Sequence, residues 1–152
     1  MRGTGGPPYR GTGYGYTAPE SGGLLAMAAA WAAGFVVLAV TSYLQVTYVY
    51  ETLGSTERLE SFGGRLLVIH LPNAVCVALG AWASSRAHRE PFRDLPVRHA
   101  FAVFTVPVLA QVLNIAIRWE RVSLEGVLMS CAVVVAGAVT GYAVDRIREG
   151  ER

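Results

Sequence analysis

The chain has 152 residues, of which 53% are hydrophobic and only 16% are charged. Soluble domains carry about 25% charged residues, and here the few charges fall between long apolar runs, so the composition excludes a soluble globular domain and predicts one integral membrane domain. The net charge is +2, and the thirteen basic residues, all Arg, are spread over several loops, which excludes a dense polyanion-binding patch and hence a nucleic-acid partner. Arg without Lys, together with many Ala, Gly and Val residues, suggests a GC-rich bacterial genome.

The first segment, residues 1–21, is rich in Gly, Pro, Tyr and Thr. It has no helix or strand period and too little apolar surface to fold alone, so we expect a disordered cytoplasmic tail. A tyrosine-bearing docking segment is the alternative, and a solvated tail is the simpler interpretation.

The membrane domain is expected over residues 22–147, and its first span over about 23–48. This run has no charge between Glu20 and Glu51 and is long enough to cross about 30 Å of hydrocarbon. Ala30 and Gly34 form a small-xxx-small pair, which lets another helix approach closely.

Three further spans are predicted, over about 66–86, 99–118 and 122–145. A short helix of one or two turns is expected near residues 57–60, before the second span. Pro107 is expected to bend the third span, and Pro72 either lies in the first turn of the second span or kinks it. In both cases backbone polar groups near Val68 to His70 need another partner. The fourth span carries Gly137 and Gly141, a GxxxG pair that predicts close packing, with the small-residue half of the first span as the expected partner.

The distribution of Arg predicts the orientation. With the N-terminus inside, nine Arg face the cytoplasm, including four in the loop 86–99, and four face outward. Both termini are therefore expected in the cytoplasm, the last residues, 148–152, as a charged tail. The loop Arg residues are candidates for contact with anionic lipid, and His88 and His99 are expected to be solvated or to touch headgroups.

Polar side chains gather in the outward halves of the predicted spans, at similar depths. They predict either a pocket open to the outside or a dry hydrogen-bond network. Interhelical hydrogen bonds in membranes average only about 0.6 kcal/mol, so such bonds can serve helix packing alone. A structural role is therefore favoured over a ligand site. Only one of them can titrate near neutral pH, so it is a candidate for proton sensing. The six candidates are Gln45, His70, Asn73, Gln111, Asn114 and Arg118.

Catalytic and metal chemistry are not predicted. Cys76 and Cys131 lie in apolar runs without metal-ligand spacing, so no metal or cofactor is expected. Ser84 and Ser85 have no base or orienting residue in the nearby sequence, which argues against a hydrolase. A proton antiport of the small multidrug exporter type needs an intramembrane carboxylate, and none is expected inside the spans.

The sequence therefore predicts an all-α, four-helix transmembrane bundle in a bacterial cell membrane. We expect a non-enzymatic accessory or interaction subunit whose partners are the bilayer and either another membrane protein or further copies of itself. A small transporter or channel that uses the outer polar cluster, and a sensor that uses His70, are the alternatives.

Overall fold

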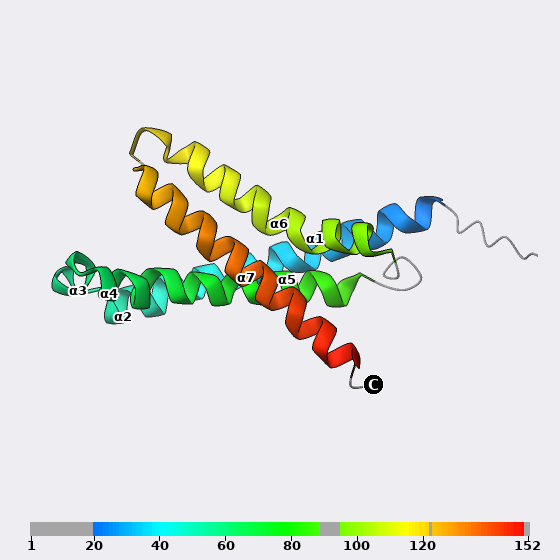
Figure 1. The fold of residues 1–152 in the computed structure, drawn as a ribbon, viewed down its shortest axis with the longest axis horizontal. Coiled ribbons are helices and arrows are strands. Elements are labelled where there is room, and N and C mark those ends of the chain that lie inside the picture. Colours follow the sequence, from blue (N-terminus) through cyan, green and yellow to red (C-terminus); the bar gives the residue numbers. More distant parts are fainter. Residues whose placement is uncertain (1–19, 89–94, 122, 151–152) are drawn as a thin grey trace, which may run out of the picture.

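The computed structural model describes residues 20–88, 95–121 and 123–150. Four helical spans, each long and apolar enough to cross a membrane, run alternately up and down (Figure 1). This architecture confirms the predicted all-α membrane bundle. The start of the first span, the end of the fourth and the gap at 89–94 share one end, here called the loop end, and the opposite end is called the turn end. The predicted disordered tail, apart from its last two residues, lies outside the described residues.

The first span combines α1 (Glu20–Leu44), a π-helical segment η1 (Gln45–Tyr50) and α2 (Glu51–Leu53). The helix thus starts within the last residues of the expected tail and continues beyond residue 48. The exposed tyrosines near this end, Tyr43, Tyr48 and Tyr50, are suited to a membrane interface.

The second span is reached through two short helices, α3 (Thr56–Glu60) and α4 (Phe62–Arg65), each begun by a serine whose side chain accepts a backbone N–H. The short helix expected at 57–60 is thereby confirmed. The helix continues through η2 (Leu66–His70), a second π-helical segment, into α5 (Leu71–Ala87). Pro72 has no N–H to offer the preceding turn, and just before it the N–H of Leu71 bonds the carbonyl of Leu66, five residues back.

The third and fourth spans are α6 (Pro96–Ile117) and α7 (Leu124–Gly150), joined through the 3-10 turn η4 (Trp119–Arg121). Pro107 lies inside α6, as predicted. α7 runs beyond the predicted end of its span, so residues 148–150 are helical instead of forming a tail; Arg148 in the last turn suits the negative end of the helix dipole.

Helix α5 is the centre of the bundle and packs against α1 on one side and α7 on another. The core contains Leu38 of the first span and otherwise small and β-branched side chains of the other three, among them Val77, Ala81, Val103 and Val134. Only 22–28% of the residues in the most apolar part of each span are buried within the protein. The remaining apolar faces are therefore left to lipid.

The Gly137 and Gly141 pair packs against α5. A Cβ added at Gly137 would lie 2.6 Å from the carbonyl oxygen of Ala74, and one at Gly141 would lie 2.9 Å from the Cβ of Ala81. The close helix contact expected from GxxxG is present. The prediction that the first span is the partner was wrong, because the two glycines pack against α5. α1 meets a different face of α5, because α5 lies between α1 and α7.

In the other predicted small pair, Ala30 and Gly34, the glycine packs on α5. Both residues are buried, and a Cβ at Gly34 would clash with Ser84 Oγ and lie 3.2 Å from the carbonyl oxygen of Gly80. Gly34, like Gly137 and Gly141, therefore brings a neighbouring helix close to α5.

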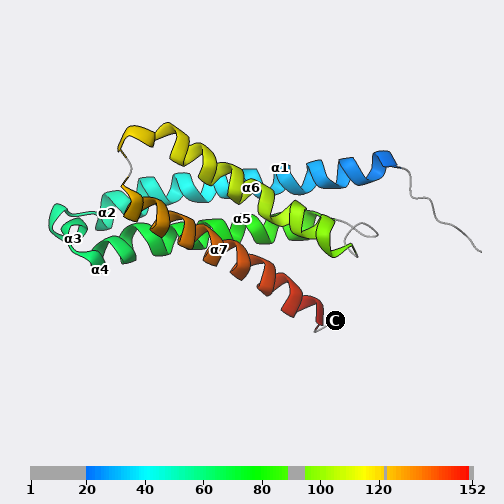
Figure 2. The ribbon, with the colours of Figure 1, turned by 45° about the horizontal axis from the view of Figure 1, so that its top comes forward.

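The hairpin formed by α6 and α7 is set apart from α1 and α5 toward the turn end, as both views show (Figure 2). In the C-terminal half of α6, most side chains after Pro107 are exposed, whereas Gln111 is buried and Ile115 is half-buried. This arrangement limits which polar groups of α6 can meet those of α5.

Candidate functional site

The loop end of the bundle contains a buried polar cluster. Ser84, Ser85, His99 and Asp145 are 0% exposed and His88 is 1% exposed. Buried polar side chains in a membrane domain need partners, because unsatisfied groups cost several kcal/mol in hydrocarbon. This cluster is the most concentrated set of titratable groups in the described core.

Three helices supply these residues. Ser84 and Ser85 lie in the last turn of α5, and His88 follows it, with its backbone N–H bonded to the carbonyl of Ser84 at 3.1 Å. His99 lies in the first turn of α6, and Asp145 near the end of α7. Asp145 follows Gly137 and Gly141 at steps of four, so the face of α7 that packs against α5 also carries the carboxylate.

Hydrogen bonds join these side chains into a chain. His88 Nδ1 lies 3.3 Å from His99 Nδ1, and His99 Nε2 lies 3.0 Å from Ser85 Oγ. Ser85 Oγ donates to Asp145 Oδ2 at 2.5 Å. Asp145 also faces Arg86, whose Nε lies 3.7 Å from Oδ1.

The chemistry of the carboxylate fixes the direction of this chain. An ionised Asp145 only accepts, so the hydroxyl of Ser85 donates to it and accepts from His99 Nε2–H. A neutral His99 then has a lone pair on Nδ1, which accepts from His88 Nδ1–H. The donors all point from His88 toward Asp145.

Aromatic side chains cover the histidine pair. The rings of His88 and His99 are stacked at 5.5 Å between centroids, and the ring of Tyr142 lies 5.6 Å from that of His99. Arg146 donates to the Tyr142 hydroxyl at 3.2 Å and lies over its ring. The imidazoles therefore sit between protein groups instead of water.

The combination of Ser85, His99 and Asp145 does not have the geometry of a hydrolase. In a catalytic triad the imidazole bonds both the serine and the carboxylate, whereas here the serine lies between the other two. Ser85 is also fully buried, so a substrate cannot reach its hydroxyl. Among the described residues, no three His, Cys, Asp or Glu side chains are arranged to hold a metal ion.

The predicted polar residues at the turn end fall into separate groups. Gln45 donates to the backbone carbonyl of Ile69 at 3.3 Å and its side-chain oxygen lies 3.3 Å from Cys76 Sγ. This bond confirms the prediction that the carbonyls near Pro72 need a polar partner. Asn73, one turn before Cys76, is half-buried.

A second group joins α6 and α7. Gln111 donates to Ser130 Oγ at 2.7 Å and lies 3.7 Å from Cys131 Sγ. Asn114 and Arg118, on the same helix, are exposed. No hydrogen bond in the described part of the chain links this group to Gln45, His70 or Asn73, because α6 is set apart from α5 at this end.

His70 lines a third feature, a cavity of about 110 Å³ between the start of the second span and the start of α7. Arg65 and Glu125 lie on its wall, together with Phe62, Ser123, Gly126 and Met129. Of the six predicted pocket residues, His70 is the one that lines this cavity.

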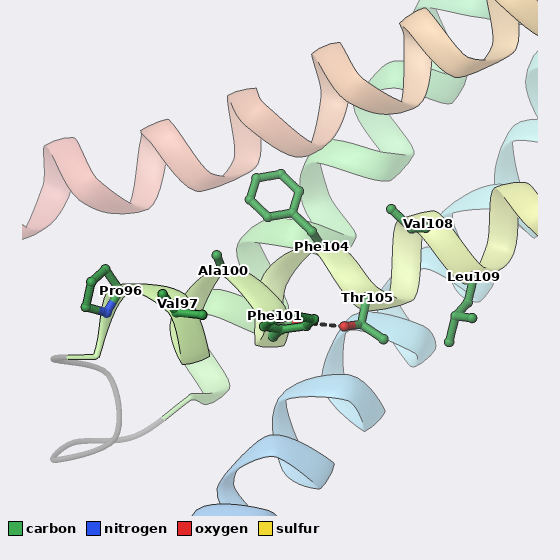
Figure 3. A pocket seen from close by; sticks show the side chains of 8 residues that line it. All are labelled: Pro96, Val97, Ala100, Phe101, Phe104, Thr105, Val108 and Leu109. Carbon is green, nitrogen blue, oxygen red and sulfur yellow. Dashed lines mark hydrogen bonds between the residues drawn. The ribbon is translucent and has the colours of Figure 1, made fainter.

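A larger cavity, of about 590 Å³, is lined by one face of α6 (Figure 3). Its lining contains no ionisable side chain, and its hydroxyl, Thr105, is bonded to the carbonyl of Phe101 at 2.5 Å. Phe101, Val108 and Leu109 are exposed, as expected of a surface in contact with acyl chains.

Sequence reasoning missed the loop-end cluster. His88 and His99 were expected to be solvated or in contact with headgroups, which is wrong, because each is buried by the other and by neighbouring helices. No carboxylate was expected inside the spans, which is also wrong, because Asp145 is buried in α7. Ser85 was expected to have no base nearby, but His99 lies beside it. Asp145 at steps of four after the glycine pair was the available signal, since it places a carboxylate on the packing face of α7.

Comparison of the chain with known protein families, with curated proteins and with solved structures finds no match.

Proposed function

We propose that the protein is a non-enzymatic accessory subunit of a bacterial cell membrane, and that it responds to the proton concentration at its loop end. The observation that carries the proposal is the contact of 3.3 Å between the Nδ1 atoms of two buried imidazoles, His88 and His99. Imidazole is the side chain that titrates between about pH 5 and pH 8 without help from its surroundings.

The pair can take up one proton but not two in this arrangement. When His99 gains a proton, both its nitrogens donate, and His88 must shift its own proton to Nε2 so that its Nδ1 can accept. A second proton would set two N–H groups against each other across 3.3 Å. Protonation of His99 therefore reverses the direction of the hydrogen bond between the rings, whereas protonation of His88 on Nε2 keeps it.

The charge added to the pair has neighbours of both signs. Asp145 favours it through Ser85, whereas the guanidinium groups of three arginines oppose it, and the balance acts on the contacts between α5, α6 and α7. The described charged or titratable groups that surround the pair are Arg86 on α5, Arg98 next to His99 on α6, and Tyr142, Asp145 and Arg146 on α7.

The distribution of Arg supports a loop end in the cytoplasm, with both termini on that side. The cluster would then report the pH of the cytoplasm. An accessory subunit passes such a change to a membrane-protein partner or to another copy of itself, which fits a chain whose buried polar groups are inaccessible to a substrate.

A transporter or channel has less support from the geometry. The cavity beside His70 has polar walls but holds only about 110 Å³. The bonds of Gln45 and of Gln111 form two separate networks instead of a continuous polar path.

Fluorescence of Trp82 tests the proposal. Trp82 precedes Ser85 by three residues on α5, and the chain has three Trp, so the double substitution W31F/W119F leaves Trp82 as the single reporter. In nanodiscs titrated between about pH 5 and pH 8, we expect one transition with the steepness of a single proton.

Substitutions assign this transition. H88Q and H99Q should each abolish the transition, while H70Q, which changes the remaining histidine of the chain, should leave it in place. Histidine side-chain NMR of the otherwise unsubstituted protein provides the same assignment if a variant does not fold. A transition that persists in both H88Q and H99Q, or that is lost in H70Q, would contradict the proposal.

A further inference from the structure

Two arginines from different helices meet at one indole ring at the loop end. The guanidinium carbon of Arg86 lies 5.9 Å from the centre of the Trp82 ring, and that of Arg148 lies 5.8 Å from it. Trp82 and Arg86 are one turn apart on α5, and Arg148 reaches them from α7. Both contacts are in the range of cation–π interactions.

Positive charge is in excess at this point. Two guanidinium groups meet here, and the carboxylate beside them, Asp145, pairs with Arg86 and also accepts from Ser85. Asp145 is fully buried, whereas Arg86 is 32% exposed and Arg148 is exposed. The guanidinium groups therefore present their remaining donors outward, where an anion can accept them.

Trp82 is half-buried. Its Nε1 is buried and has no hydrogen-bond partner among the described residues. A ligand therefore meets the exposed part of the indole ring instead of its N–H.

An apolar surface leads from the arginines toward the middle of the membrane. Val75, Leu79, Trp82 and Arg86 follow one another at steps of four, three and four, so they share one face of α5. Val75 and Leu79 are 51% and 40% exposed, and Val144, one turn before Arg148 on α7, is 40% exposed. A ligand that fills this surface is anionic at one end and apolar along its length.

We propose that Trp82, Arg86 and Arg148 bind the phosphate of an anionic phospholipid, whose acyl chain lies along Val75 and Leu79. The guanidinium groups donate to the phosphate oxygens, and Trp82 supplies an interfacial aromatic surface. This site involves other atoms than the histidine pair, so it does not depend on the proposed response to protons.

Native mass spectrometry of the full-length protein in detergent tests the site. The probes are phosphatidylglycerol and phosphatidylcholine with identical acyl chains, and inorganic phosphate alone. We expect phosphatidylglycerol to bind more tightly than phosphatidylcholine, and R148Q to weaken it about fivefold, the effect of one basic residue near a membrane surface. W82F should also weaken the binding of phosphatidylglycerol, and R148K should bind this lipid more tightly than R148Q does.

The matched control is R121Q, the same change at an exposed arginine of the turn end. It should leave the affinity for phosphatidylglycerol unchanged. Equal affinities for the two lipids, or equal losses in R148Q and R121Q, would overturn the proposal. Displacement of phosphatidylglycerol by inorganic phosphate at comparable concentration would assign the site to a free anion and would overturn it as well.

Discussion

Replacement of Gly137 by Ala tests the contact between α5 and α7 most directly. The new Cβ would lie 2.6 Å from the carbonyl oxygen of Ala74 and 2.9 Å from the Cβ of Val77, whereas ordinary contact begins at 3.4 Å. The two helices must therefore separate by roughly 0.8 Å. The groups in the way are a backbone carbonyl and a core side chain, neither of which can turn aside.

The magnitude follows from two opposing effects. Overpacking of this kind costs about 1–3 kcal/mol, and Ala in place of Gly in a helix returns about 0.5–1 kcal/mol. We expect G137A to lower the free energy of unfolding by about 1–2 kcal/mol. G141A should cost more, because its Cβ would come still closer to the carbonyl of Ala78.

Unfolding in mixed micelles, titrated with sodium dodecyl sulfate and followed by circular dichroism, measures this difference. The control is G63A, because a Cβ at Gly63 meets nothing within 4 Å. G63A should therefore stabilise the protein or leave it unchanged. If G137A behaves like G63A, α5 and α7 do not pack closely at Gly137, and the reasoning is refuted.

Three more predictions concern the cluster, the turn end and the topology. D145A should lower the free energy of unfolding by about 3 kcal/mol, because it removes the acceptor of Ser85 and the counter-charge of Arg86; D145N, which keeps an acceptor oxygen, should cost less in the same titration. Q111L should cost under about 1 kcal/mol, since it loses one interhelical bond to Ser130, and a larger loss would show that this bond is more than packing. Reporter fusions after Arg148 and within residues 57–60 should show the C-terminus inside and the short helix outside, and periplasmic activity of the C-terminal fusion would reverse the orientation.

The four spans were predictable because length and apolar composition decide which segments can cross a membrane. The predicted spans agree with the observed helices to within a few residues, although the third was predicted to end one residue after α6 and the fourth to begin two residues before α7. The helical turns before the second span follow from serines suited to cap them. A polar hydrogen-bond partner for the carbonyls near Pro72 was also expected, because a proline leaves an acceptor unsatisfied. The order in which the helices pack was not predictable, and it decided the partner of Gly137 and Gly141.

The loop-end cluster could not be found by depth alone. His88 lies outside the predicted spans and His99 is the first residue of one, where solvation is the simplest expectation, and their burial depends on how α6 returns to α5. The turn-end residues, in contrast, were expected to lie together and do not. Asn114 was expected near His70 and Asn73 because the three residues have similar depths in the membrane. However, α6 diverges from α5 at this end, so Asn114 is exposed. The angle between two helices cannot be predicted from the depth of their residues.

The two π-helical segments make the turn end tolerant of a change in chain length. A π turn holds one residue more than an α turn, so η2 carries an extra residue between two stretches of regular helix. Removing one residue from Leu66–His70 would restore α-helical spacing and keep the flanking residues on the faces they now occupy. The same deletion within α5 would rotate every later side chain by about 100° and turn Ser85 away from Asp145. The length of this protein is thus adjustable at the turn end and fixed beside the cluster.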